Sequence, residues 1–254
     1  DWSSDVCSSD LQEAFLPKSQ PKHPGLSFFD YYKAAEQVGG DYFDYFELEN
    51  GKIVIALADV VGHGVAAAML MAKLSAEARF AFASISDPRK AMEQLNNRIT
   101  ALDADRFITM SVIVFDVASS KATIVIAGHM PPIHYRADGS IHEPGGEEDI
   151  GGPALGIEFD IGFDSVEITL EPGETLTMYT DGIFEAPNAD GQQFSMERIR
   201  KILQGAKSDV NLAGKTVIAQ VTDHIVGCAQ EDDMCMVIVG RDEVSSYDTA
   251  PDIA

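Results

Sequence analysis

Short runs of apolar and β-branched residues dominate the chain, and stretches with helical spacing separate them into groups. Tyr42–Leu48 and Ile53–Leu57 indicate two strands, and the Asn50-Gly51 pair between them is typical of a hairpin turn. The same criteria predict further strands at Leu26–Ala35, Phe107–Val117, Ala122–Ala127, Ile133–Arg136, Ser140–His142, Val166–Leu170, Thr175–Tyr179 and Met234–Val239.

Four helices complete the pattern. Apolar residues recur at four-residue spacing within Val65–Ala83, which indicates a helix. The Asp87-Pro88 pair is typical of a helix start and precedes a second helix at Arg89–Leu102. Two further helices are predicted at Phe194–Leu203 and Leu212–Val226. Gly205 is the expected C-cap of the first of these two.

The order of these elements is strands, helix pair, strands, helix pair and strand. Strands joined by hairpins favour antiparallel sheets and the α+β class. We therefore predict a four-layer αββα sandwich, in which two stacked antiparallel β-sheets are flanked by helix pairs. This domain is expected to span residues 14–242. Residues 1–13 are expected to be a disordered leader or the end of an upstream linker helix, and residues 243–254 a polar tail.

The charge balance narrows the range of partners. The 254 residues include 18 basic and 41 acidic side chains, which gives a net charge of −23. A protein this acidic is poorly suited to bind nucleic acid or an anionic membrane surface. Val65–Ala83 is the most apolar long stretch, but charged residues interrupt it, so no membrane span is expected. Cys7, Cys228 and Cys235 lack zinc-like spacing, and we interpret them as free thiols of a cytoplasmic protein.

Aspartates stand at the ends of several predicted strands. These residues are Asp41, Asp59, Asp181 and the Asp232-Asp233 pair. Each one alone is better explained as a turn former. In two stacked sheets, however, such strand ends can converge on one rim, and buried carboxylates need a compensating cation. A site made only of oxygen ligands favours Mg²⁺ or Mn²⁺ over zinc.

Seven motifs in order along the chain resemble one known family. They are Gly39-Gly40-Asp41-Tyr42-Phe43-Asp44, Ala58-Asp59-Val60-Val61-Gly62-His63-Gly64, Arg106-Phe107-Ile108-Thr109-Met110, Ala127-Gly128-His129-Met130-Pro131-Pro132, Leu155-Gly156-Ile157, Tyr179-Thr180-Asp181-Gly182-Ile183-Phe184-Glu185 and Asp232-Asp233-Met234. With them the chain resembles the metal-dependent protein phosphatases of the protein phosphatase 2C (PPM) type. The resemblance is to their bacterial branch, which includes the stage II sporulation E and sigma-B regulator phosphatases.

The resemblance implies a site with two Mn²⁺ or Mg²⁺ ions. The residues that it assigns as metal ligands are Asp41, Asp59, the backbone carbonyl of Val60, Asp181 and Asp232. Asp41 and Asp59 would thereby be catalytic, and His63 is a candidate general acid. Gly182 and Asp233 would support the ligands without binding metal. Asp44 would at most do the same, because it lies three residues along a strand from Asp41 and should face the other way.

The implied activity is hydrolysis of phosphoserine or phosphothreonine on a protein by metal-activated water. The resemblance suggests a small phosphorylated anti-anti-sigma (STAS-type) regulator as substrate and an upstream sensor or receiver domain absent from this chain. It is also compatible with a homodimer. Two alternatives stay open at this point. The chain could be a non-catalytic PPM-fold module that binds a regulator, or a metal hydrolase that acts on a small phosphoester.

Overall fold

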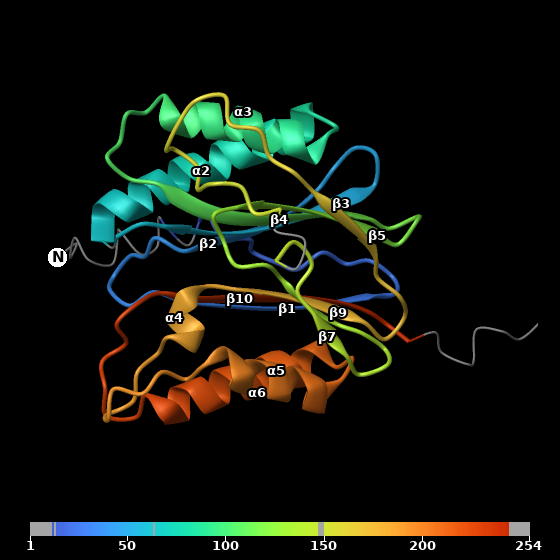
Figure 1. The fold of residues 1–254 in the computed structure, drawn as a ribbon, viewed down its shortest axis with the longest axis vertical. Coiled ribbons are helices and arrows are strands. Elements are labelled where there is room, and N and C mark those ends of the chain that lie inside the picture. The colour runs from blue at the N-terminus through green and yellow to red at the C-terminus, as the bar shows by residue number, and fades with distance from the viewer. Residues whose placement is uncertain (1–11, 13, 63, 147–149, 244–254) are drawn as a thin grey trace, which may run out of the picture.

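Two five-stranded antiparallel sheets stack face to face, and helices cover the outer side of each (Figure 1). This computed structural model describes residues 12, 14–62, 64–146 and 150–243. One sheet has the order β1 (Leu26–Lys33), β10 (Met234–Arg241), β9 (Thr175–Tyr179), β6 (Ile133–Tyr135) and β7 (Ile141–His142). The other has the order β2 (Tyr42–Glu47), β3 (Lys52–Val60), β4 (Ile108–Asp116), β5 (Lys121–Ala127) and β8 (Val166–Thr169).

The helices form the two outer layers. They are α2 (Gly64–Ser84) and α3 (Pro88–Thr100) over the β2–β3–β4–β5–β8 sheet, and α5 (Met196–Ala206) and α6 (Val210–His224) over the other sheet. A single turn, α4 (Asp181–Phe184), follows β9. The predicted αββα sandwich is therefore confirmed. None of the helices in the described part of the chain is long and apolar enough to cross a membrane.

Strand β3 shows how the layers are built. Its alternate residues Val54, Ala56 and Ala58 pack with α2 and α3, whereas Ile53, Ile55 and Leu57 pack between the two sheets. Both faces are buried, which explains why the strand reads as a nearly continuous apolar run. The alternation continues one step beyond Leu57, so the side chain of Asp59 falls on the face between the sheets.

Local signals explain where several elements begin. The Asp87 carboxylate caps α3 by accepting a hydrogen bond from the Arg89 N–H, and Pro88 occupies the first turn, as the sequence predicted. The predicted C-cap at Gly205 is wrong, because α5 continues to Ala206 and the C-cap is Lys207, which has a positive φ of 56°. The glycine instead lies inside the helix, where its backbone needs no special freedom.

The predicted helix at Phe194–Leu203 begins two residues later than expected. The backbone N–H groups of Phe194 and Ser195 donate to the carbonyls of Ala186 and Phe184. These contacts hold the segment after α4 in an extended pairing, and α5 can start only at Met196. Helix α4 itself was not predicted, because the Asp181-Gly182 pair reads as a turn.

Candidate metal centre

The β2–β3 hairpin brings two of the predicted ligands together. Tyr42 pairs with Ala58 in the antiparallel register, and one further step places Asp41 opposite Asp59. Side chains opposite each other on one face of such a pair have Cβ atoms about 5 Å apart. Asp41 is only 2% exposed, while Asp59 is partly buried. The hairpin therefore directs two carboxylates into the gap between the sheets.

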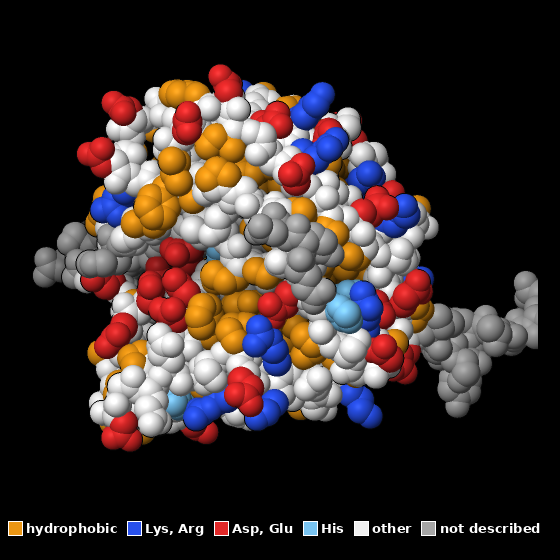
Figure 2. All heavy atoms as spheres, in the orientation of Figure 1, with side chains coloured by type: hydrophobic (Ala, Val, Ile, Leu, Met, Phe, Trp, Pro, Cys, Tyr) orange, Lys and Arg blue, Asp and Glu red, His pale blue; other side chains and the backbone are white. Residues whose placement is uncertain are grey.

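The second sheet supplies the other acidic residues of the site. Asp181 follows β9 as the first residue of α4, and the Asp232-Asp233 pair lies directly before β10. Strands β9 and β10 are hydrogen-bonded neighbours. The strand ends of both sheets thus meet at one rim. Figure 2 shows acidic side chains gathered at this end of the molecule, between the two helical layers.

Thr180 connects the two sheets at this rim. Its hydroxyl donates a hydrogen bond to Asp41 Oδ2 at 2.7 Å and accepts one from the Cys235 N–H at 3.0 Å. The Thr180 N–H in turn donates to the Cys235 carbonyl. Thr180 is fully buried, so its only effective partners are within the protein. It fixes the orientation of the Asp41 carboxylate relative to β10.

The carboxylates act on one another electrostatically. Burial raises the pKa of Asp41 well above its ordinary value, and the nearby Asp59 charge raises it further. Burial also raises the pKa of Asp59 to about 7, with further contributions from the charges of Asp181 and Asp232. The pKa of Asp181 is raised by burial and then by Glu185. The charged groups that act most strongly on Asp41 and Asp59 are thus all carboxylates.

Asp233 has a different role from its neighbour. It is buried, and its carboxylate accepts hydrogen bonds from the backbone N–H groups of Ala35 at 2.8 Å and Gly40 at 2.6 Å, with a longer one from Asp41. It therefore holds the loop that carries Asp41. Asp232 is exposed at the rim, and its Oδ1 accepts from the Asp233 N–H. This placement leaves Asp232 accessible from solvent.

Gly182 is needed for close packing of this rim. A Cβ atom at this position would lie 1.9 Å from the Asp233 carbonyl oxygen. Only glycine therefore lets α4 approach the loop that carries Asp232. The same loop constrains Gly39, where a Cβ atom would lie 2.3 Å from Asp233 Oδ2.

Asp44 lies on the opposite face of β2, as the strand period predicts. Its carboxylate is fully buried against α2, where it accepts two hydrogen bonds from the Arg79 guanidinium at 2.6 and 2.7 Å. The Tyr42 hydroxyl and the Tyr45 N–H donate to it as well. Its charge is balanced on the far side of the sheet from Asp41, so any support that it gives the site passes through β2.

Of the two histidines in the motifs, only His129 lies among the described residues. His63 lies outside the described residues, so its role as general acid stays a prediction. His129 is buried between Thr109 Oγ1, 2.8 Å from its Nδ1, and the Tyr179 carbonyl, 3.1 Å from its Nε2. Burial lowers its pKa to about 4, so the ring is neutral at pH 7, with Nε2–H donating to the carbonyl. Because Thr109 pairs with Asp59, His129 supports the strand behind that carboxylate.

Sequence reasoning missed the parts played by Thr180 and Thr109. Both lie inside quoted motifs, next to Asp181 and opposite Asp59, but nothing in the local pattern shows which partner a threonine hydroxyl meets. Asp233 was assigned only a supporting part, and its hydrogen bonds now show which backbone groups it holds.

The donor set fits a hard divalent cation. It consists of carboxylates with excess negative charge, which is the chemistry that Mg²⁺ and Mn²⁺ select. The side chains do not form a ready-made cage, because no three His, Cys, Asp or Glu residues in the described part of the chain are grouped closely enough to hold an ion. Mutual repulsion opposes a closer grouping of these carboxylates, and a bound cation would reduce that repulsion.

Curated proteins with similar sequences include two phosphatases of Bacillus subtilis strain 168. Phosphoserine phosphatase RsbU is 27% identical over 190 residues, covering 72% of this chain and 54% of RsbU. Phosphoserine phosphatase RsbP is 25% identical over 171 residues, covering 65% of this chain and 41% of RsbP. Protein IcfG of Synechocystis is 25% identical and is matched over 40% of its length. The chain thus spans about half or less of these relatives.

Solved structures and a family model point to the same group of proteins as these curated relatives. The SiaA-PP2C domain of Pseudomonas aeruginosa has a TM-score of 0.81 at 21% identity, covering 94% of this chain and 95% of that domain. The RsbU and RsbW domains of Rv1364c from Mycobacterium tuberculosis have a TM-score of 0.70 at 26% identity, covering 86% of this chain and 60% of that one. Residues 49–242 match the family model described as stage II sporulation protein E (SpoIIE). The chain therefore belongs to the SpoIIE family of PPM-type phosphatases.

Proposed function

We propose that this protein is a metal-dependent serine/threonine protein phosphatase, which hydrolyses phosphoserine or phosphothreonine on a protein substrate. The observation that carries the proposal is the group of carboxylates at the rim between the sheets. The Asp59 charge raises the pKa of Asp41, the charges of Asp181 and Asp232 raise that of Asp59, and no basic side chain is among the groups that affect them most. A fold retains such a group at a cost in stability, which points to a cation supplied from outside.

The residues that would hold two Mn²⁺ or Mg²⁺ ions are Asp41, Asp59, the Val60 carbonyl, Asp181 and Asp232. When bound, such ions supply an activated water and neutralise phosphoryl oxygens. The protein's own part is positional. Thr180 Oγ1 occupies Asp41 Oδ2 and so directs the other oxygen of that carboxylate, while Asp233 fixes the backbone of the same loop. Gly182 lets α4, which begins at Asp181, pack closely against the loop of Asp232 and Asp233.

A phosphorylated anti-anti-sigma protein of the STAS type is the substrate that we propose. The family resemblance supports it, and so does the similarity to two proteins named phosphoserine phosphatases. The greater length of the curated relatives supports an additional sensor or receiver domain in the whole protein. The free thiols of Cys228 and Cys235 support a reducing cytoplasm. A homodimer is compatible with these features.

The alternative is a non-catalytic PPM-fold module that binds a regulator. A module without catalysis would be free to lose the acidic residues at the rim. This chain keeps Asp41, Asp59, Asp181 and Asp232. The complete set favours the enzyme.

The proposal is tested by measuring phosphate release from a phosphoserine protein in the presence of Mn²⁺. We expect Asp59→Asn and Asp181→Asn to abolish release, and Glu49→Gln, an exposed hairpin residue, to leave it unchanged. Excess chelator should stop the wild-type enzyme. Full activity in chelator would refute the metal-dependent reaction, and wild-type activity in Asp59→Asn would refute the assigned site.

A further inference from the structure

We infer that the pocket between α4 and residues 225–232 binds a lysine or arginine side chain that lies near the phosphorylated residue of the substrate. The inference rests on the proposed phosphatase function and adds a sequence preference to it. The pocket is lined by α4, by the segment that follows it and by the loop that leads to β10. It has a volume of about 390 Å³, enough for a long side chain.

The pocket borders the candidate metal centre. Gly182 and Asp232 form part of its wall, and both belong to the rim described above. A substrate whose phosphoryl group lies at the rim would therefore place a neighbouring residue at the mouth of the pocket. The pocket and the metal centre can therefore contact one substrate molecule at the same time without any movement of the domain.

The charges of the pocket favour a cation. Glu185, Glu231 and Asp232 line it, and none of its lining residues is basic. Glu185 and Glu231 are exposed, and no ion pair joins either of them to a basic side chain among the described residues. A basic residue of the substrate would thus meet two carboxylates that form no ion pair within the described part of the chain.

Gln230 gives an independent indication of a hydrogen-bond donor. Its Nε2 donates to the carbonyls of Lys33 at 2.9 Å and Asp232 at 2.8 Å, which fixes the orientation of the amide. Its Oε1 is buried and has no hydrogen-bond partner in the described part of the chain. A buried acceptor without a donor is costly, and a guanidinium or ammonium group in the pocket could supply one.

The remaining walls suit the stem of a basic side chain. Ala186, Pro187, Ile225 and Met234 contribute apolar surface. Lysine and arginine combine an aliphatic stem with a charged end, so they can use both kinds of wall at once. A small inorganic cation would leave the apolar part unused, and an acidic side chain would be repelled.

A basic residue beside the phosphoryl group would also help association. The protein carries a net charge of −23, so positive charge on a phosphorylated segment would reduce its repulsion by the protein as a whole. Complementary charge at the edge of an interface favours encounter and fixes register. The pocket would thereby select phosphorylated segments that contain a correctly spaced basic residue.

The test uses short phosphoserine peptides in which a single arginine is moved through the positions on either side of the phosphoserine. Norleucine replaces the arginine in matched control peptides. With Mn²⁺ present, we expect one arginine position to lower KM by about tenfold, the effect of one favourable charged contact, with kcat little changed. For each enzyme variant, the KM of an arginine peptide is compared with the KM of its norleucine control.

The double variant Glu185→Gln/Glu231→Gln should remove the preference for arginine, and Glu231→Lys should favour glutamate at the same position. The matched control Glu47→Gln/Glu49→Gln removes two exposed charges at the far end of the β2–β3 hairpin and should keep the preference. A lysine peptide should partly replace the arginine peptide.

The outcomes separate this inference from the proposed function. If the enzyme hydrolyses p-nitrophenyl phosphate with Mn²⁺ but shows equal KM values for all peptides, or turns over none of them, the pocket inference is overturned, whereas the metal-dependent hydrolysis of phosphoesters stands. A preference that survives in Glu185→Gln/Glu231→Gln also overturns it. If no phosphoester is hydrolysed with Mn²⁺, the proposed function fails, and the inference fails with it.

Discussion

Asp41 and Asp44 are three residues apart and both buried, yet only the charge of Asp44 is paired with a basic side chain. Asp44 faces α2 and receives hydrogen bonds from the Arg79 guanidinium and the Tyr42 hydroxyl. Asp41 faces the gap between the sheets, where Thr180 provides one neutral hydrogen bond and the strongest charged neighbour is Asp59. One carboxylate is balanced within the fold, and the other is not.

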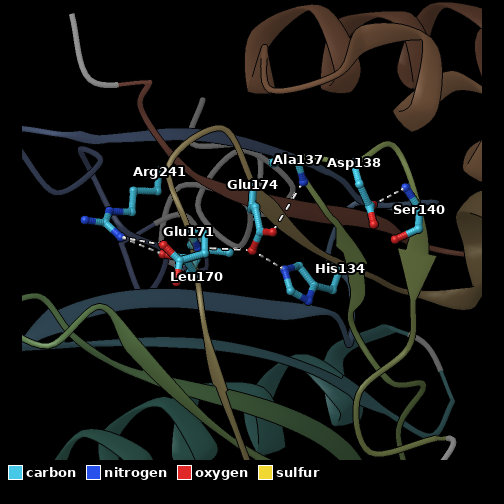
Figure 3. Close-up of polar contacts among 8 residues, drawn as sticks. All are labelled: His134, Ala137, Asp138, Ser140, Leu170, Glu171, Glu174 and Arg241. Carbon is cyan, nitrogen blue, oxygen red and sulfur yellow. Dashed lines mark hydrogen bonds and ion pairs between the residues drawn. The ribbon is translucent and has the colours of Figure 1, made fainter.

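A buried cluster at the other end of the sandwich resembles the Asp44 case (Figure 3). Glu174 lies 2.8 Å from His134 Nε2 and accepts hydrogen bonds from the backbone N–H groups of Glu171 and Ala137. Burial lowers the pKa of His134, while Glu174 counteracts that effect. The turn before β9 and the hairpin of β6 supply the hydrogen-bond donors for the Glu174 carboxylate, so its role is structural.

The comparison gives a criterion for function that burial alone does not. Asp41, Asp44 and Glu174 are all buried acids, but only Asp41 lies among other carboxylates. Asp233 is an intermediate case, because backbone N–H groups stabilise its charge and it in turn holds the loop of Asp41. An acid whose charge is unbalanced inside the protein marks the place where a cation is expected.

The largest expected effect comes from Asp59→Asn. Activity should fall by on the order of 10²–10³-fold or more, comparable with the loss of a preorganised electrostatic contact. The metal-free protein should be as stable as the wild type or more so, because one repulsive charge is removed. Activity assays and thermal unfolding in chelator check the two parts. A variant that loses both activity and metal-free stability would show that Asp59 is structural, as Asp44 is.

Gly182→Ala should disturb the rim without changing any charge. The added methyl group would lie 1.9 Å from the Asp233 carbonyl, so the backbone must move, at about 2–3 kcal/mol. Activity should fall together with stability, because Asp181 and Asp232 move apart. Gly205→Ala is the matched control, since nothing lies within 4 Å of its Cβ position, and it should stabilise α5 by about 0.5–1 kcal/mol. Chemical denaturation measures the change in unfolding free energy for both variants.

Arg79→Met tests the balanced side of the comparison. It leaves the fully buried Asp44 carboxylate without its cation and should cost about 2 kcal/mol of unfolding free energy, less than for a fully buried pair because the Arg79 side chain is 48% exposed. Lys121→Met breaks the exposed pair with Glu167 and should leave the unfolding free energy nearly unchanged, because solvent screens both charges. Equal effects of the two substitutions in urea unfolding would show that Asp44 does not depend on Arg79.

The smallest expected effect is a pH dependence of the metal-free protein. The folded pKa of Asp59 is raised to about 7, above its unfolded value, so the folded state binds more protons between these values. Stability in chelator should therefore be highest below about pH 4 for this group and should fall as the pH rises through about 7. The fall should be about 1–2 kcal/mol, less than the full pKa shift implies, because Asp59 is only partly buried and solvent screens its charge. Unfolding curves across this range, with Asp59→Asn as reference, measure the effect. A flat difference between the two proteins would contradict it.

The hairpin half of the site could be predicted from the sequence. The Asn50-Gly51 turn sets the register, and the two-residue period of a strand then places Asp41 and Asp59 on one face and Asp44 on the other. The layers followed from the grouping of strands and helices. These features depend on neighbours in the sequence, so a local pattern reveals them.

The other half depends on contacts between distant segments. The Thr180 hydroxyl meets Asp41 across 139 residues, and Asp233 meets the Gly40 N–H across 193. No local pattern shows these partners. The same reason explains why α4 and the late start of α5 were missed, since the pairing of Phe194 with Ala186 decides where that helix begins. Tertiary packing, rather than local helix propensity, determines where these two helices form.

The central claim is that the unbalanced carboxylates hold metal and the balanced ones do not. Calorimetric titration of Mn²⁺ into the metal-free wild type, Asp59→Asn and Glu49→Gln tests it directly, with circular dichroism to show that each protein is folded. We expect wild type and Glu49→Gln to bind Mn²⁺ alike, and Asp59→Asn to bind at least tenfold more weakly, as expected when a contact to the ion is lost. Unchanged Mn²⁺ binding by Asp59→Asn would contradict the claim.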